Sequence, residues 1–506
     1  MNKQHYKIAL AAAVSVILAN VSMGGSVSAE SKWLVGASSA VTAVQNTSDK
    51  ATSEAAIAVL VKQGVLSGYS DGTMKPQQNV KRAELAKMVV LALQVDGKQA
   101  ERIPLNDVQP QHWFANYVHT LVDQEIMPSN EGQFKPYEHV TQAQLVQIIA
   151  KALQRDALSV QSWIKSTFTA NQPATRADTS QLLVSAQKSI RSETAKITKL
   201  RSLNKVTMEA TFDQPLTLAD ESLDAGLKHF IFNNGLELVN QPRLKSGSFA
   251  TYILPTKTQV PGTTYTLTYK NDQKLTVEAS AELIRMNMAR QVDRDSFELE
   301  ALKADGVADY GYLISAYAGG RGANAFILND NNELNGQPFQ IISSLRSRSV
   351  TITPEGGQAM VASYLPFTQS TDGKQEPKFR LPNGAQFKPG VKYTVTSDWL
   401  TVKNASFVAE SAAQVKLDAA AQVDAATVAV TLQEDPADEI FVLREVKLTG
   451  SDGSEAKAQY VLQSRKGATG TFELQNNAKL TAGVTYTVQP LEDWAIAAEV
   501  VTFTAK

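Results

Sequence analysis

One phrase of this sequence is written twice, and this duplication constrains the fold more than any other feature. The first copy, residues 68–93, reads GYSDGTMKPQQNVKRAELAKMVVLAL, and the second, residues 131–153, reads EGQFKPYEHVTQAQLVQIIAKAL. Their turns correspond at an offset of 60 positions (132 − 72), which pairs Gly72 with Gly132 and Pro76 with Pro136. Self-similarity of this length indicates copies of one small structural unit.

The second half of each copy is predicted to be an amphipathic helix, because its apolar residues recur with helical spacing. Five apolar positions of the first copy match five of the second: Leu85, Met88, Val89, Ala92 and Leu93 against Leu145, Ile148, Ile149, Ala152 and Leu153. Chance similarity between alanine-rich helices would not also place the Gly, the Lys-Pro and the Val of the turn. We therefore expect two helix–turn–helix units.

A third, eroded copy follows at residues 174–187, ATRADTSQLLVSAQ. It has Arg176 where the first copy has Arg82, whereas the second copy has Gln142 at that position. Only 34 positions (176 − 142) separate it from the second copy, so much of its leading helix and turn is missing or remodelled. Thr141 and Thr175, each with an acceptor three residues later, are typical helix N-caps.

The N-terminus predicts export. Lys3 and Lys7, the apolar run IALAAAVSVILA and the small residues ending at Ala29 form a secretory signal peptide over residues 1–29. The apolar run is shorter than the ~20 residues of a membrane span. The C-terminal residues EVVTFTAK carry no covalent-anchor motif, so the mature chain is expected to be secreted, without a membrane span, and held non-covalently if it is held at the surface.

Composition excludes several classes of site. The 506 residues include no cysteine, which rules out disulfides, thiolate metal sites and a cysteine nucleophile. Lys and Arg number 49 against 50 Asp and Glu, so no global basic field would recruit nucleic acid. An anionic ligand would need a local site. The five histidines show no metal-ligand spacing, and we expect no metal site.

Beyond about residue 192 the sequence changes to short strands and turns. Three phrases recur: PGTTYTLTY at 261–269, PGVKYTVTS at 389–397 and AGVTYTVQP at 482–490. Each places a turn Gly three residues before a Tyr that opens a strand. This pattern is typical of β-sandwiches. We predict three of them, at 192–282, 283–410 and 411–506; the alternative is one large β-domain with a recurring hairpin.

The repeats resemble the S-layer homology family. Its motif elements stand here as Asp107-Val108, Trp113, GYSDGTMKP and KRAE, and the likeness covers about residues 49–190. The resemblance implies an all-α, pseudo-threefold bundle at 30–191, with copies near 49–94, 107–154 and 156–190. It also implies grooves between copies that hold a secondary cell wall polymer ending in pyruvylated N-acetylmannosamine. The whole chain is then a helical bundle followed by all-β, Ig-like sandwiches.

The resemblance carries five residues over as polymer contacts. Arg82 and Arg176 are expected to anchor the carboxylate of the ketal, since a guanidinium offers two parallel donors. Asp107 and Trp113 are expected to contact the sugar, and Gly68 to let the backbone approach it. Two other interpretations stay open: Trp113 as core at the head of a helix, and Arg82 with Glu84 as a surface charge pair. No single copy holds the whole motif.

These features predict a non-enzymatic protein of the Gram-positive cell wall or S-layer. Its repeats bind an anionic, pyruvylated polymer, and its sandwiches form or decorate the surface, with self-association into a lattice as a further expectation. The alternative is a wall-attached adhesin whose sandwiches bind a separate partner. Neither Gly-x-Ser-x-Gly nor His-Glu-x-x-His occurs, so we expect no catalytic residues and no cofactor, with calcium for assembly as the one weak exception.

Three loops have alternative interpretations. The acidic stretches 328–336 and 450–455 suggest calcium, but neither has the Asp/Asn alternation and final Glu of a calcium loop, which favours solvated turns. The stretch AGGRGANAF at 318–326 lacks the Gly-Lys-Ser/Thr ending of a phosphate loop, which favours a hairpin tip.

Overall fold

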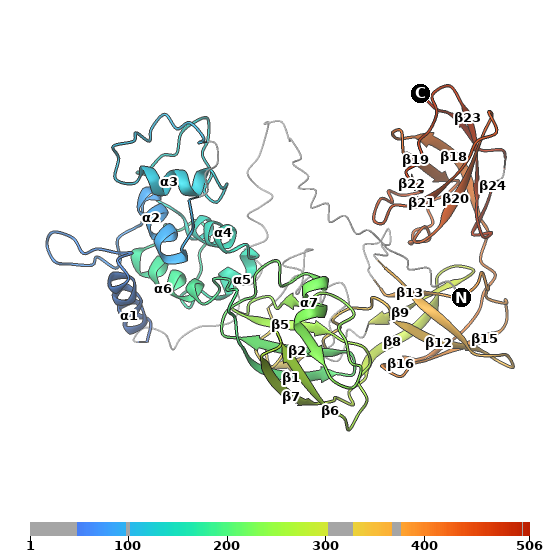
Figure 1. Cartoon of the computed structure of the whole chain (residues 1–506), viewed down its shortest axis with the longest axis horizontal. Coiled ribbons are helices and arrows are strands. Elements are labelled where there is room, and N and C mark those ends of the chain that lie inside the picture. Colours follow the sequence, from blue (N-terminus) through green and yellow to red (C-terminus); the bar gives the residue numbers. More distant parts are fainter. Residues whose placement is uncertain (1–47, 98–101, 302–326, 367–375, 498) are drawn as a thin grey trace. The chain divides into compact units, whose positions relative to one another are not determined.

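The computed structural model describes residues 48–97, 102–301, 327–366, 376–497 and 499–506 (Figure 1). The predicted signal peptide and the stretch 318–326 lie outside these residues. Most of the described helices lie in the blue-to-teal part of the chain. They are α1 (Ser48–Lys62), α2 (Arg82–Leu93), α3 (Ala115–Val122), α4 (Gln142–Leu153), α5 (Ala157–Ser162) and α6 (Arg176–Gln187).

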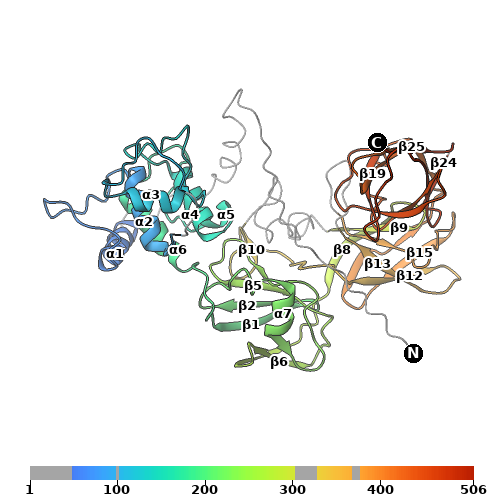
Figure 2. The ribbon, with the colours of Figure 1, turned by 45° about the horizontal axis from the view of Figure 1, so that its top comes forward.

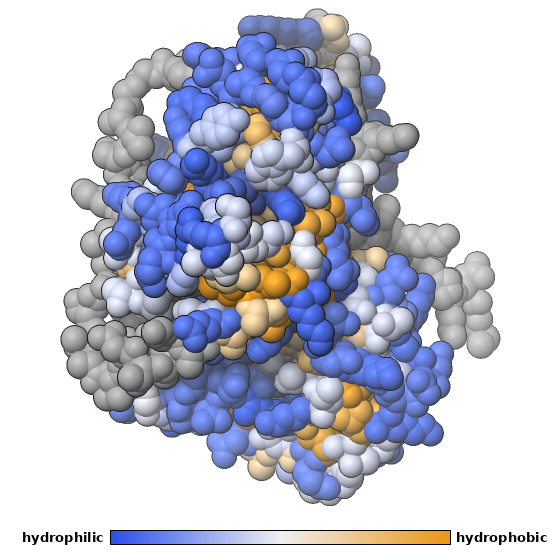
Figure 3. Space-filling view, turned by 90° about the vertical axis from the view of Figure 1, so that its left-hand side faces the viewer, coloured by the Kyte–Doolittle hydropathy of each residue, from blue (hydrophilic) through white to orange (hydrophobic). Residues whose placement is uncertain are grey.

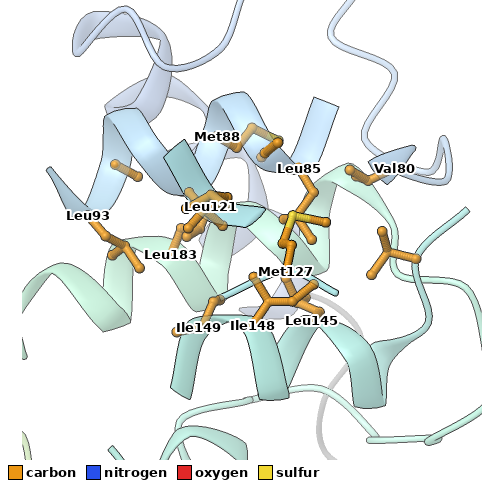
Figure 4. Close-up of a cluster of buried hydrophobic side chains, with 14 of the residues drawn as sticks. Val80, Leu85, Met88, Leu93, Leu121, Met127, Leu145, Ile148, Ile149 and Leu183 are labelled. Carbon is orange, nitrogen blue, oxygen red and sulfur yellow. The ribbon is translucent and has the colours of Figure 1, made fainter. Parts of the chain in front are cut away.

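The helices bury the apolar stripe that the repeats share. Figure 4 shows these side chains pointing towards one another between α2, α3, α4 and α6. Leu85, Leu121, Ile149 and Leu183 are fully buried, and Leu145 is nearly so. Burying side chains of this size stabilises the fold by roughly 1.5–3 kcal/mol each. The apolar residues that recur with helical spacing in the sequence therefore form the core of the bundle.

The starts and ends of the main helices follow the sequence signals. The Thr141 hydroxyl accepts a hydrogen bond from the Gln144 N–H at 3.2 Å, and the Thr175 hydroxyl accepts one from the Asp178 N–H at 3.1 Å. Both predicted N-caps are confirmed. The third copy keeps only the six-residue α5 as its leading helix, which confirms that its first half is remodelled.

The three copies close a ring through backbone hydrogen bonds. Val80 N–H donates to the Ala174 carbonyl at 2.9 Å, Val140 N–H to the Val80 carbonyl at 3.0 Å, and Ala174 N–H to the Val140 carbonyl at 2.8 Å. These residues precede the second helix of the first, second and third copy, respectively. Each copy therefore bonds to both of the others, which gives the bundle its pseudo-threefold arrangement.

After α6, nearly all of the described secondary structure consists of strands. The first sandwich joins the sheet β1-β2-β5-β4 and the sheet β3-β6-β7, with the short helix α7 (Leu223–His229) before β3. Its strands are β1 (Ile197–Asn204), β2 (Thr207–Phe212), β3 (Phe230–Phe232), β4 (Arg243–Leu244), β5 (Thr251–Pro255), β6 (Thr264–Tyr269) and β7 (Gln273–Glu278). A hydrophobic cluster that includes Met208, Tyr252 and Leu267 fills the space between them.

The second and third sandwiches share one strand order. It runs β16-β8-β9-β14-β13-β12-β15-β17 in the second and β24-β18-β19-β22-β21-β20-β23-β25 in the third, and these orders correspond strand for strand. In each, one pair is parallel, β16 with β8 and β24 with β18. Figure 2 shows the strands of the third curling round towards closure, where β18 also lies beside β25.

The bounds of the strands in these two sandwiches are as follows. The second has β8 (Ile284–Gln291), β9 (Ser296–Ala301), β12 (Ser349–Pro354), β13 (Met360–Leu365), β14 (Lys378–Arg380), β15 (Lys392–Thr396), β16 (Leu400–Asn404) and β17 (Ser406–Val408), with a small hairpin β10 (Glu333–Leu334) and β11 (Gln337–Pro338). The third has β18 (Val415–Gln422), β19 (Thr427–Leu432), β20 (Glu445–Gly450), β21 (Glu455–Tyr460), β22 (Thr469–Leu474), β23 (Thr485–Pro490), β24 (Ala495–Ala497) and β25 (Thr502–Thr504).

The recurring Gly-x-x-Tyr phrase has a structural cause. In each sandwich the Tyr is the second residue of its strand and its hydroxyl accepts a hydrogen bond from a backbone N–H five residues earlier. Val260 donates to Tyr265 at 3.1 Å, Lys388 to Tyr393 at 3.0 Å and Thr481 to Tyr486 at 2.9 Å. The glycine between them has φ of 79°, 80° or 83°, a backbone conformation that favours glycine. This is the tyrosine corner of Ig-like sandwiches.

The predicted fold class is confirmed: an all-α repeat region is followed by β-sandwiches. The buried residues of the β region form three clusters rather than one. The domain boundaries proposed from the sequence remain predictions. Within the described residues, no helix is long and apolar enough to cross a membrane. Hydrophilic residues cover most of the face drawn in Figure 3, and hydrophobic ones show in one central area and in smaller areas elsewhere.

Candidate functional site

Arg82 opens α2 of the first copy but binds the turn of the second. Its Nε donates to the Phe134 carbonyl at 2.7 Å and its Nη2 to the Pro128 carbonyl at 2.6 Å. Its guanidinium also lies 4.5 Å from the centre of the Phe134 ring. Only 8% of the residue is exposed. Burial lowers the pKa of Arg82, while the carboxylates of Glu138 and Asp107 act in the opposite direction.

Arg176 repeats this contact between the third copy and the first. Its Nε donates to the Met74 carbonyl at 2.9 Å and its Nη2 to the Ser67 carbonyl at 3.1 Å. The guanidinium lies 5.1 Å from the centre of the Tyr69 ring, and the residue is buried. The two arginines predicted to anchor the ligand carboxylate therefore each hold the turn of a neighbouring copy.

Gln142 makes the corresponding contact from the second copy to the third. Its Oε1 accepts a hydrogen bond from the Thr169 N–H at 2.8 Å. The residue that opens each second helix thus holds the next copy round the ring: Arg82 the second, Gln142 the third and Arg176 the first. The remodelled third copy presents an N–H where the others present carbonyls. An acceptor is needed there, which explains why the second copy has Gln and not Arg.

Asp107 holds the turn of the second copy from another side. Its Oδ1 accepts from the Phe134 N–H at 2.9 Å and its Oδ2 from the Lys135 N–H at 2.6 Å. The peptide group that joins Phe134 to Lys135 therefore bonds Arg82 through its carbonyl and Asp107 through its N–H. Because a peptide carbonyl and N–H point in opposite directions, the arginine and the carboxylate lie on opposite sides of it. This role was not predicted from the sequence.

Trp113 is 60% exposed, so it is not the core residue of the alternative interpretation. Its ring meets the buried Phe114 edge-on at 5.3 Å, and Tyr137, 67% exposed, meets the same ring edge-on at 6.2 Å. The Lys81 ammonium lies 5.8 Å from the centre of the Tyr137 ring. The second copy thus presents two exposed aromatic rings beside a cation, an arrangement that suits the faces and hydroxyls of a sugar.

Gly68 lies in the first turn, exposed and packed closely against Met74. A Cβ built on it would lie 3.1 Å from Met74 Cε, so a side chain at this position would require a shift of the methionine. In the same turn, Lys75 Nζ pairs with Asp71 Oδ2 at 3.1 Å and lies 4.3 Å from the centre of the Tyr69 ring.

The Asp71 carboxylate also fixes the first turn. It accepts hydrogen bonds from the Thr73 hydroxyl at 2.6 Å and the Thr73 N–H at 3.0 Å. These bonds, followed by Lys75, lower the pKa of Asp71 to about 2.

The structure divides the five predicted residues between two turns. Arg82 and Asp107 meet at Phe134, with Trp113 in the same copy, whereas Arg176 and Gly68 meet at Met74. Glu84 is not the partner of Arg82, because its Oε2 accepts from the Lys81 N–H at 2.9 Å. Whether any of the five contacts a polymer remains a prediction. Two aromatic residues were not predicted as site residues: Tyr69, inside the motif GYSDGTMKP, and Tyr137, directly after the Lys-Pro of the second turn.

Metal binding finds no support in the described ranges, which contain no group of three or more His, Asp and Glu side chains that could hold an ion. In both acidic stretches a side-chain oxygen accepts hydrogen bonds from groups of the same turn. Asn329 Oδ1 accepts from the Asn331 and Glu333 N–H groups, and Asp452 Oδ1 accepts from the N–H and hydroxyl of Ser454.

Comparison with known proteins identifies the same first two copies that the sequence predicted. The model of the S-layer homology domain matches residues 46–86 and 104–146. A surface layer protein of Brevibacillus choshinensis is 31% identical over 119 residues, 22% of this chain and 11% of that protein. The middle cell wall protein of Brevibacillus brevis is 30% identical over 173 residues, which cover 29% of this chain and 16% of that protein. The cellulosome-anchoring protein of Acetivibrio thermocellus is 29% identical over 109 residues, which cover 21% of this chain and 24% of that protein.

The chain therefore spans less than a quarter of the length of these curated relatives. Among solved structures, the N-terminal part of the bacterial S-layer protein SbsC aligns with 72% of this chain and 76% of its own, at 13% identity and a TM-score of 0.19. An overlap with a TM-score this low carries no structural conclusion. The duplicated phrase, the ring of three copies and the family match lead to one conclusion: residues 46–86 and 104–146 are S-layer homology repeats, and a β-sandwich region follows them in the chain.

Proposed function

We propose that the helical bundle attaches this protein non-covalently to the cell wall by binding an anionic, pyruvylated wall polysaccharide, and that the sandwiches are displayed outside it as part of a surface layer. The observation that carries the proposal is the exposed pair Trp113 and Tyr137, 60% and 67% accessible, in the copy whose turn Arg82 and Asp107 hold in place. Large aromatic rings rarely stay exposed without a partner, and a sugar ring suits them.

The preorganised turns support the proposal. A turn whose carbonyls and N–H groups are already bonded loses little conformational entropy when a ligand binds, which favours affinity. Cell-wall relatives such as the middle cell wall protein and the cellulosome-anchoring protein share sequence with this chain. An envelope location agrees with the signal peptide predicted from the sequence.

Co-sedimentation tests the proposal. The full mature chain is mixed with purified Gram-positive wall sacculi, either intact or stripped of their secondary polysaccharide, and the bound fraction is measured. We expect binding to intact walls only. Trp113→Ala should weaken it, whereas Trp399→Phe, in the second sandwich, is the control and should leave it unchanged. Equal binding to stripped walls would contradict the proposal, as would unchanged binding of the Trp113 variant.

A further inference from the structure

The third copy differs from the second in the connection that leads to its first helix. In the second copy this connection runs from the end of α2 at Leu93 to the start of α3 at Ala115, and it contains Asp107 and Trp113. In the third copy only residues 154–156 lie between α4 and α5. The third copy therefore lacks the stretch that carries the aspartate and the tryptophan.

The short connection and α5 bond to one loop of the first sandwich, residues 245–250 between β4 and β5. Arg155, inside the connection, donates from Nη2 to the Ser248 carbonyl at 2.7 Å. Trp163, directly after α5, donates from Nε1 to the Gly247 carbonyl at 2.7 Å. Burial lowers the pKa of Arg155 to about 10, so the guanidinium remains a charged donor at neutral pH, and charged donors make the stronger hydrogen bonds.

Phe249 adds an apolar contact to these bonds. Its ring centre lies 5.0 Å from that of Trp163, and the side chain packs against the hydrophobic core of the bundle. The Lys188 ammonium lies 5.4 Å from the centre of the same ring. The Gly247 N–H donates to the Ser159 hydroxyl at 2.7 Å. The loop of the sandwich thus supplies a side chain to the core of the bundle, where Trp163 is only 7% exposed.

The chain that joins the two domains is also bonded. Residues 188–196 connect α6 to β1. Within them, Arg191 Nη1 donates to the Leu216 carbonyl at 2.6 Å, and the Ser192 N–H donates to the Pro215 carbonyl at 2.9 Å. Domains joined by a flexible linker ordinarily move relative to one another, and a short linker bonded to one of them restricts that motion.

The arginine that bonds the loop replaces an apolar residue of the preceding repeat. Gln94 and Gln154 are the left-handed C-caps of α2 and α4, with φ of 54° and 52°. The next residue is Val95 after α2 and Arg155 after α4. Val95 packs against the core of the bundle, whereas Arg155 bonds the sandwich. The same place in the repeat thus has an inward contact in one case and an outward contact in the other.

We propose that the shortened third copy is a docking site for the first sandwich, which it holds through the loop 245–250, and that the bundle and this sandwich unfold as one unit. The occupant of the site is a segment of the chain itself. The inference goes beyond the proposed function and does not depend on wall binding, since none of its contacts involves Trp113 or Tyr137.

Hydrogen exchange at the tryptophan indoles tests the docking contact. The full chain is labelled with 15N at tryptophan and transferred to D2O. We expect the Trp163 indole N–H to exchange more slowly than that of the exposed Trp113, by a factor on the order of 100 or more. Trp399 and Trp494, whose indoles also donate to backbone carbonyls, serve as the protected references. Exchange of Trp163 as fast as that of Trp113 would overturn the proposal.

Urea unfolding of the full chain tests the coupling. Methionine labelled with 13C at its methyl group reports each domain, because Met127 is buried in the bundle and Met208 in the first sandwich. We expect both native signals to disappear with one midpoint. In Phe249→Ala the two midpoints should separate by about 0.5–1 M urea. Phe503→Ala, which truncates a half-buried phenylalanine of the third sandwich, is the control and should leave them together.

A second variant alters the bundle's side of the contact. Arg155→Val introduces the residue type that follows the C-cap of α2, and it should also separate the midpoints of Met127 and Met208. Separate midpoints in the wild type would overturn the proposal, and this result does not require any variant to fold. A midpoint that stays shared in both Phe249→Ala and Arg155→Val would equally contradict it.

Discussion

Replacing Arg82 with alanine should destabilise the helical bundle, because Arg82 holds the neighbouring copy. The change removes the donors at 2.7 and 2.6 Å from the carbonyls of Phe134 and Pro128. Hydrogen bonds from a charged group contribute about 1.5–3 kcal/mol each. Part of this is offset because a buried guanidinium no longer needs to be desolvated. We therefore expect a loss of about 2–4 kcal/mol in the free energy of unfolding of the bundle.

Urea unfolding followed by circular dichroism at the helix band measures this loss, since α7 is the only described helix outside the bundle. Lys62→Ala, at an exposed lysine at the end of α1, is the matched control and should change the free energy by less than about 0.5 kcal/mol. Wall binding is measured on the same variants. A loss of stability below about 1 kcal/mol together with a loss of wall binding would contradict the structural role of Arg82 and indicate that it binds the ligand.

Three further predictions follow from other contacts. Gln142→Arg should lower the stability of the bundle by about 1 kcal/mol, because Thr169 loses its acceptor; a higher urea midpoint would count against the ring of contacts. Tyr393→Phe should cost the second sandwich about 1–2 kcal/mol through loss of the bond from Lys388, as followed by tryptophan fluorescence in urea; an unchanged midpoint would dismiss the tyrosine corner as a stabilising device. The carboxyl of Asp71 should titrate by NMR near pH 2, below its ordinary value of 3.8, so its contribution to stability is complete above pH 3.8 and is lost as the pH falls towards 2; a midpoint at the ordinary value would contradict its bonds to Thr73.

Much of the fold could be predicted because it depends on local sequence patterns. The helical spacing of Leu85 and Leu145 set the core, and Thr141 and Thr175 set helix starts. The Gly-x-x-Tyr phrases marked the sandwiches, although the sequence alone did not show that the tyrosine hydroxyl was the reason. The matching strand order of the second and third sandwiches could not be predicted, since it depends on pairings between strands far apart in the chain.

The candidate site was predicted less completely. The motif identified Arg82, Arg176 and Asp107, but in the structure their polar atoms bond to backbone groups of turns. Such a role depends on which carbonyl or N–H of another copy lies opposite, and a single sequence does not contain that information. The sequence offered no reason for Gln142 in place of Arg in the second copy. It follows from the remodelled third copy, which presents the Thr169 N–H at that place.

Calorimetric titration of the full chain with a wall glycan fragment that carries its pyruvyl ketal is the most direct test of the proposed wall binding. Binding should disappear when the ketal is removed, and an affinity that is unchanged by this removal would contradict the proposed function.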